Sequence, residues 1–426
     1  MKVALLAASL AASVSCHGQT RNEILLKKWD FSRDKVNWKQ VTVPHDWAID
    51  GPFDKKWDIQ YLAIVQDGQE RPIEHTARSG GLPWIGEGSY KTTFNIKKGT
   101  KHAQIYFDGA MSEPIVKVNG KEVGRWMYGY NAFRLNITPY IKDGENSVEV
   151  HLNNLEESSR WYPGAGLYRP VKLITTNESR IDEWETYFKT VSANHQKALL
   201  KVDTRIEDGN ALKNLTTKVE LLDAQGKQVV TGQQKINQQG AASFNLEVTN
   251  PHLWDIDTPY LYTLKTTLLK GKKAIDQTTT KVGIRTIDVS KEYGFRLNGK
   301  SLKFKGVCLH HDLGALGAAL NKTAVIRQIE MMKKMGVNAI RTSHNMPSQM
   351  QMDVCDSLGM MVMAESFDAW KDLKVKNGYG RIYDEWWRKD LENLIKGHRN
   401  HPSIVMWSIG NEIPEQSNKA GAARAK

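Results

Sequence analysis

Cysteine is nearly absent from this sequence, which has three in 426 residues, at positions 16, 308 and 355. Disulfides therefore cannot organise the fold. Cys308 and Cys355 stand among apolar residues, so we expect two buried thiols. Basic runs of five or more, zinc-finger spacing and a basic zipper are also missing. The formal charge of +12 is spread along the chain and indicates a lysine-rich surface; we expect no nucleic-acid partner.

Long apolar runs are missing beyond residue 18, so no transmembrane segment is predicted. The start of the chain is different. Lys2 is followed by the apolar stretch 3–12, a pattern that predicts a secretory signal peptide over residues 1–18. Cys16 is a candidate for lipid attachment, but Ser13 fits the lipidation motif poorly, and ordinary cleavage near Gly18 is the alternative. We expect an exported protein, periplasmic or secreted. Anchoring to a membrane through a lipid on Cys16 stays an alternative.

Aromatic residues, in contrast, are plentiful, with 13 Trp and 14 Tyr. Flat aromatic faces suit the C–H surfaces of sugars, although packing in ordinary cores explains them equally well. The apolar fraction of 40% and the absence of long low-complexity segments predict several folded domains.

Two β domains are predicted first. Residues 22–178 contain short segments of alternating apolar and polar residues separated by glycine turns, which is typical of a jelly-roll β-sandwich. Residues 179–288 continue with longer strands and contain no acid–base cluster. They predict an immunoglobulin-like β-sandwich that acts as a spacer.

Strands and helices alternate from residue 289 to residue 426. The apolar patterns predict strands at 302–309, 337–340, 360–364 and 404–409, with helices at 323–335, 348–358 and 384–397. This series is the first half of a TIM (β/α)8 barrel.

Polar side chains follow each predicted barrel strand. They are His310 after the first strand, Arg341 and His344 after the second, Glu365, Asp368 and Trp370 after the third, and Asn411 and Glu412 after the fourth. Each group has a plain structural explanation, such as a core histidine or a helix cap at Asn411. However, the carboxyl ends of barrel strands meet on one face, where catalytic residues lie, so four such groups in series favour an active site.

Two loops of the first domain are also unusual. One is the stretch 43–47, which contains Asp46. The other is 160–169, which is rich in aromatic residues and glycine and begins with Arg160. They are explained either as a packed corner between domains or as loops that shape a sugar pocket.

Together these motifs resemble glycoside hydrolase family 2, the β-galactosidase and β-glucuronidase group. The stretch 160–169 resembles the jelly-roll signature of the family, and 406–412 resembles its acid/base signature. Arg341-Thr342-Ser343-His344 and the stretch 43–47 are similar to further landmarks. The resemblance extends over nearly the whole chain after the signal peptide.

The resemblance implies a retaining exo-β-glycosidase that hydrolyses terminal β-D-galactosides of an oligosaccharide or glycan. Glu412 would be the acid/base, and Asn411 would bind the 2-hydroxyl of the sugar. The other residues that it places at the substrate are His310, His344, Arg341, Glu365, Asp368, Trp370, Asp46 and Arg160. β-Glucuronidase, another exo-β-glycosidase of the family and a non-catalytic sugar-binding fragment are the alternatives. Asp368 and Trp370 favour the galactosidase branch.

One departure from the family pattern is important. The nucleophile of the family is a glutamate on a later barrel strand, and the sequence ends soon after Glu412. We therefore expect a C-terminally truncated chain without the nucleophile, with Glu365 or Asp368 as conceivable substitutes. The magnesium site of some β-galactosidases is not recognisable around Asp368, so no metal and no cofactor are expected.

Overall fold

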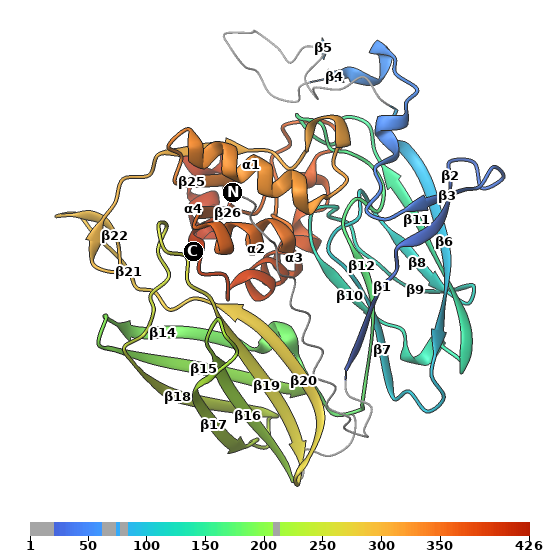
Figure 1. The fold of residues 1–426 in the computed structure, drawn as a ribbon. Coiled ribbons are helices and arrows are strands. Elements are labelled where there is room, and N and C mark those ends of the chain that lie inside the picture. The colour runs from blue at the N-terminus through green and yellow to red at the C-terminus, as the bar shows by residue number, and fades with distance from the viewer. Residues whose placement is uncertain (1–20, 62–73, 77–83, 208–213) are drawn as a thin grey trace, which may run out of the picture.

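The computed structural model describes residues 21–61, 74–76, 84–207 and 214–426. The signal peptide and Cys16 lie outside these residues and stay predictions. Figure 1 shows two β-sandwiches, one blue to cyan and one green to yellow, beside a red and orange part that mixes strands and helices. The predicted fold class is thereby confirmed.

The first sandwich consists of two antiparallel sheets. The smaller sheet has the order β1 (Asn22–Leu25), β12 (Val171–Thr176), β7 (His102–Phe107) and β10 (Phe133–Asn136). The larger sheet has the order β3 (Lys39–Thr42), β2 (Lys28–Ser32), β6 (Gly86–Ile96), β11 (Gly144–Asn154), β8 (Ile115–Val118) and β9 (Lys121–Arg125). A short pair, β4 (Ile59–Tyr61) and β5 (Glu74–Thr76), forms a separate two-stranded sheet, which Figure 1 shows above the sandwich.

Alternation along these strands builds the core between the two sheets. In β11, every second residue from Asn146 to Asn154 is buried. Phe107 and Phe133 stack with ring centroids 4.7 Å apart, and Tyr90 and Val150 are fully buried opposite them. Period-two burial is the reason that this stretch forms a sandwich rather than helices.

The second sandwich also has two antiparallel sheets. In the first sheet, β15 (Lys197–Glu207) pairs with β13 (Arg180–Ile181), β14 (Tyr187–Ala193) and β18 (Ala241–Thr249). The second sheet has the order β17 (Gln228–Lys235), β16 (Leu215–Leu222), β19 (Tyr262–Lys270) and β20 (Lys273–Val282). Buried residues of both sheets, among them Leu200, Val219 and Phe244, form one core.

A small antiparallel sheet leads into the mixed part, and parallel strands follow. The small sheet consists of β21 (Ile287–Ser290), β22 (Gly294–Leu297) and β23 (Lys300–Ser301). The parallel sheet has the order β24 (Gly306–Leu309), β25 (Ala339–Thr342), β26 (Met361–Glu365) and β27 (Ile404–Ser408). The helices are α1 (Lys322–Lys334), α2 (Gln349–Leu358), α3 (Tyr383–His398) and α4 (Lys419–Ala425).

The two faces of the parallel sheet differ. Val307, Ile340 and Val362 share one face and pack against Val325 and Ile329 of α1. The opposite face carries Cys308, Arg341 and Met363, which neighbouring strands place in register. Because strands are parallel, the polar residues after each of them gather at one edge.

The first predicted barrel strand is shorter than expected, and Asn338 supplies the reason. The side chain of Asn338 accepts a hydrogen bond from the Lys305 amide at 2.8 Å and donates one to the Lys303 carbonyl at 3.0 Å. The Asn338 amide also donates to the Lys305 oxygen at 3.0 Å, so residues 303–305 are held largely by the side chain of Asn338 and not by a regular strand ladder. Accordingly β24 begins at Gly306 and β25 begins at Ala339.

Buried polar contacts connect the first sandwich to the α/β part. Asp390 of α3 is fully buried and accepts hydrogen bonds from Trp126 Nε1 at 2.8 Å and Asn131 Nδ2 at 2.7 Å. The buried guanidinium of Arg169 donates to the main-chain oxygens of Met346 and Pro347. In the parts of the chain that the structure describes, no helix has the length and apolar character needed to cross a membrane.

Candidate active site

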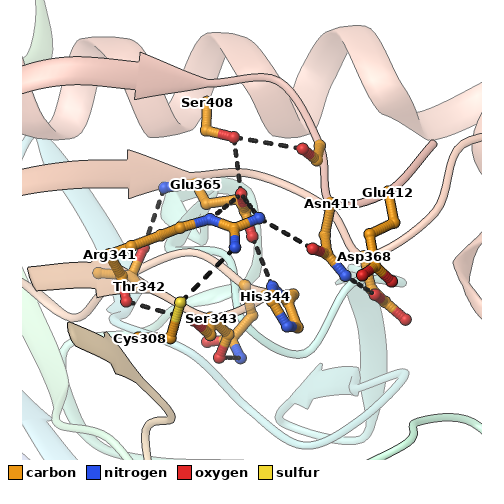
Figure 2. A network of polar contacts seen from close by, with 12 residues as sticks. Cys308, Arg341, Thr342, Ser343, His344, Glu365, Asp368, Ser408, Asn411 and Glu412 are labelled. Atoms are coloured by element: carbon orange, nitrogen blue, oxygen red, sulfur yellow. Dashed lines mark hydrogen bonds and ion pairs between the residues drawn. The ribbon is translucent and has the colours of Figure 1, made fainter. Parts of the chain in front are cut away.

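The carboxyl edge of the parallel sheet carries a connected polar network, which Figure 2 shows. Its centre is the guanidinium of Arg341 from the end of β25. Arg341 Nε donates to Glu365 Oε2 at 2.8 Å, and Nη2 donates to Asn411 Oδ1 at 2.9 Å. One side chain therefore links the ends of three neighbouring strands, as their order in the sheet requires.

Glu365 is the most enclosed carboxylate of this network. Its side chain has no exposed surface, and His344 Nδ1 lies 2.8 Å from Oε1. The hydroxyl of Ser408 donates to Oε2 at 2.6 Å. Both oxygens therefore have partners within the site.

Asp368 forms a second group with the jelly-roll loop. Arg160 binds it through two nitrogens, at 3.0 Å to Oδ2 and 2.7 Å to Oδ1. Oδ1 also accepts hydrogen bonds from Lys374 Nζ at 3.2 Å and Asn411 Nδ2 at 2.9 Å. Burial raises the pKa of the Asp368 carboxyl, but the hydrogen bond and charge of Arg160 outweigh it, so the pKa lies below its ordinary value.

Glu412 differs from both of these carboxylates because its side chain is 75% exposed. Its nearest charged neighbours are Arg160 Nη2 at 3.9 Å and Lys374 Nζ at 4.0 Å from Oε2. Asn411, directly before it, is buried and held at both ends of its carboxamide. The arrangement presents one free carboxyl group beside a fixed amide on an open face.

Two histidines complete the edge, and Trp161 of the jelly-roll loop covers them. The Trp161 ring lies 5.3 Å from the ring of His310 and 5.9 Å from that of His344, measured between centroids. His310 Nδ1 is buried and has no hydrogen-bond partner among the described residues. Burial, followed by the neighbouring His344, lowers the pKa of His310, so this ring is neutral near pH 7 and able to accept or donate a hydrogen bond.

Three family models match consecutive parts of the chain. They are the sugar binding domain of the glycosyl hydrolases family 2 at residues 23–177, the family 2 model at 179–285 and the family's TIM barrel domain at 287–425. The chain belongs to glycosyl hydrolase family 2.

Relatives within family 2 carry two different names. A β-galactosidase of Bacteroides ovatus, BoGH2A, is 40% identical over 91% of this chain and 44% of its own length. A putative β-glucuronidase of Formosa agariphila is 39% identical over 91% of this chain and 36% of its own length. The crystal structure of a family 2 member from Bacteroides cellulosilyticus has a TM-score of 0.84 and 34% identity, covering 94% of this chain and 53% of that one. The chain thus spans less than half the length of the Bacteroides ovatus and Formosa agariphila relatives, and about half of the crystallised one.

Asp46 and Trp370, which the sequence also placed at the substrate, are enclosed within the family 2 fold, as Glu365 is. Asp46 is 1% exposed, and its carboxylate accepts hydrogen bonds from Tyr162 Oη at 2.6 Å and the Ala318 amide at 2.8 Å. Trp370 packs in a core and donates to the Ile409 oxygen at 2.7 Å. Both brace the loops that surround the site. In the loop 160–169, Arg160 reaches Asp368 while Leu167 and Tyr168 are buried, which agrees with a packed corner between domains. Its role in a sugar pocket stays a prediction.

Lys374 is the site residue that sequence reasoning missed. It lies in a lysine-rich segment, where its neighbours Lys371 and Lys376 are exposed, and nothing in the local pattern distinguishes it. Cys308 requires a correction. We expected it to be buried, but it is exposed, because it lies on the face of the sheet opposite the helices. Cys355 is buried, as expected.

A cluster with metal-ligating side chains lies at the other end of the barrel strands. Asp353, Asp356 and His401 bring their ligand atoms within 4.8 Å of one another. However, His401 Nδ1 and Asp356 Oδ2 are 2.5 Å apart, which is a hydrogen bond that leaves no room for an ion between them. His401 precedes β27, whereas the network around Glu412 follows it. The cluster is therefore a structural contact separate from the candidate site.

Proposed function

We propose that this chain supplies the acid/base half of a retaining exo-β-galactosidase, with Glu412 as the acid/base. The observation that carries the proposal is the contrast between one exposed carboxyl group, which has only two long ion pairs among the described residues, and two enclosed carboxyl groups with short hydrogen bonds at the same edge. Glu412 is 75% exposed, whereas Glu365 has no exposed surface. Proton transfer to a leaving oxygen needs a carboxyl group that the substrate can reach.

A retaining mechanism needs a second carboxylate about 5–5.5 Å from the first. Neither Glu365 nor Asp368 suits this role, because charged partners occupy the oxygens of each. We propose that the nucleophile is a carboxylate outside the residues that the structure describes. Asn411, held by Arg341 and Asp368, would bind the 2-hydroxyl of the sugar.

The choice of galactoside over glucuronide rests on charge. Among the described residues of the site, Arg160 and Lys374 are paired with Asp368, and Arg341 is paired with Glu365. None of these three cations is free to bind the carboxylate of a uronic acid. This supports an uncharged sugar as the substrate.

The test is a parallel assay of the full-length protein on aryl β-galactoside, β-glucuronide and β-mannoside. We expect kcat/KM for the galactoside to exceed that for the glucuronide by at least about 100-fold, because the carboxylate of the uronic acid would be left without a free cation in the site. The mannoside, which is uncharged, tests whether the site also distinguishes the configuration of the sugar hydroxyls. A preference for the glucuronide would replace the proposal with a β-glucuronidase, a name that several relatives carry.

The 426 residues alone offer a second candidate function, that of a sugar-binding unit without turnover. The engagement of both Glu365 and Asp368 favours it for the isolated chain. We expect weak galactose binding in a titration and no hydrolysis. Turnover by the isolated chain would overturn this candidate and place the nucleophile among the 426 residues.

A further inference from the structure

Lys374 follows β26 in a loop, and its ammonium group lies inside the site. Only 3% of its side chain is exposed, which is unusual because lysine normally keeps its charge in water. Burial lowers the pKa of Lys374, and the Asp368 carboxylate offsets this only in part. A buried ammonium needs compensating partners, so the identity of those partners indicates its role.

The shortest contact of this ammonium is with the main chain. Lys374 Nζ donates to the Asn411 oxygen at 2.7 Å. This oxygen belongs to the peptide group that joins Asn411 to Glu412, so its direction sets the orientation of the Glu412 backbone. Glu412 has φ of 44°, in the left-handed region that residues other than glycine rarely adopt. Such a conformation persists only where its surroundings hold it.

The same ammonium also restrains the side chains around that peptide. It lies 3.2 Å from Asp368 Oδ1, which in turn accepts from the Asn411 carboxamide at 2.9 Å. It is 4.0 Å from Glu412 Oε2, on which Arg160 also acts from 3.9 Å. Lys374 therefore contacts the backbone before Glu412, the partner of Asn411 and the carboxylate of Glu412 itself.

We propose that Lys374 is a positioning residue that holds the Asn411–Glu412 peptide so that the Glu412 carboxyl group points at the leaving oxygen of the substrate. This inference rests on the proposed function of Glu412. Its consequence is selective. Loss of Lys374 would impair protonation of the leaving group. Sugar binding and nucleophilic attack would stay nearly intact, because Arg341 and Asp368 still hold the Asn411 carboxamide and Arg160 still holds Asp368.

The experiment compares two galactosides in the full-length protein with Lys374→Met, which keeps the length of the side chain and removes its charge and donors. Phenyl β-galactoside has a poor leaving group that needs protonation, whereas 2,4-dinitrophenyl β-galactoside does not. General acid catalysis contributes about 100- to 10,000-fold, so misplacing the acid should reduce kcat/KM for the phenyl substrate about 10- to 100-fold. For the dinitrophenyl substrate we expect a change below about threefold.

The matched control is Lys376→Met, two residues away, whose exposed ammonium forms a long ion pair with Glu157 at 3.6 Å. It should leave kcat/KM for both substrates unchanged. Equal losses on both substrates in Lys374→Met would show a merely structural role and overturn the inference. No loss on either would also overturn it.

A crystal structure of Lys374→Met separates this inference from the proposed function. If the unaltered protein hydrolysed no glycoside, the proposed function would fail, but the structural claim could still be decided. We expect the Asn411 carbonyl to rotate and Glu412 to leave the left-handed region. An unchanged Asn411–Glu412 peptide would overturn the positioning role.

Discussion

Glu365 is the last residue of β26, Glu412 follows the neighbouring strand β27, and the surroundings of the two carboxylates are opposite. Glu365 has no exposed surface and is bound by Arg341, His344 and Ser408. Glu412 is 75% exposed, and its nearest cations are 3.9 and 4.0 Å away. The comparison shows that a carboxylate at a barrel edge can serve to fix the site or to react, and that its partners decide which.

The largest expected effect concerns the free carboxylate. Glu412→Gln in the full-length protein should lower kcat on phenyl β-galactoside by about 100- to 10,000-fold, because the amide cannot transfer a proton. Its effect on the free energy of unfolding should stay within about 0.5 kcal/mol, since the side chain is mostly exposed. Steady-state kinetics and thermal unfolding measure the two effects. Unchanged kcat would remove Glu412 from the mechanism.

Replacing the enclosed carboxylate, Glu365, should affect stability far more than replacing Glu412 does. Glu365→Gln places a neutral amide against Arg341 and His344 and should lower the free energy of unfolding by about 2–4 kcal/mol. A shift of the thermal transition relative to Glu412→Gln gives the comparison. Equal stability of the two variants would contradict the distinction drawn here.

A third carboxylate, Asp390, sharpens the comparison because it is as buried as Glu365 but has neutral partners. Burial raises its pKa to about 6, although Tyr379, Asn131 and Trp126 donate hydrogen bonds to it. The folded protein therefore binds this proton at a pH where the unfolded chain, with a pKa near 3.8, does not. The contribution of Asp390 to stability should therefore be largest at about pH 4 and should be lost as the pH rises through about 6.

Asp390→Asn tests this linkage because the amide does not titrate. The difference in thermal unfolding temperature between Asp390→Asn and the unaltered protein should change between pH 4 and pH 7. A difference that is independent of pH would show that Asp390 is ionised throughout this range.

The smallest effect concerns two thiols with the same contrast in exposure. Cys308 is exposed and Cys355 is buried, and burial raises the pKa of Cys355 well above its ordinary value. In a protein that consists of residues 19–426, and so lacks Cys16, a thiol reagent should modify one cysteine in the absence of denaturant. The substitution Cys308→Ser should abolish this reaction. Modification of both thiols in the native chain would contradict the arrangement of the sheet faces.

The architecture could be predicted from local patterns, because period-two alternation and apolar helical spacing are properties of neighbouring residues. The edge residues Arg341, Glu365 and Asn411 could be predicted to meet, since parallel strands place their carboxyl ends together. Lys374 could not be predicted, because its burial depends on contacts with Asp368 and Asn411 that no local pattern encodes. The exposure of Cys308 depends on which face the helices cover, and a four-residue strand does not specify this.

The roles of Asp46 and Trp370 show a different limit. Sequence motifs identified both as part of a site, and each does lie in the loops around it. Their own polar atoms, however, are bound to other parts of the protein, as with Asp46 and the amide of Ala318. A sequence motif therefore identifies the region of a site. The hydrogen-bond partners in the structure are needed to tell which side chains of that region are available to a substrate.

The buried guanidinium of Arg169 has a consequence for protein engineering. It belongs to the first sandwich, but it donates to the Met346 and Pro347 oxygens of the loop after β25 as well as to the Asp108 and Tyr130 oxygens of its own domain. Cutting the chain between these domains would leave main-chain acceptors without donors on the barrel side. The first sandwich is thus not an exchangeable module. A chimera with the sandwich of a relative would have to carry over the arginine and the loop that it binds as one unit.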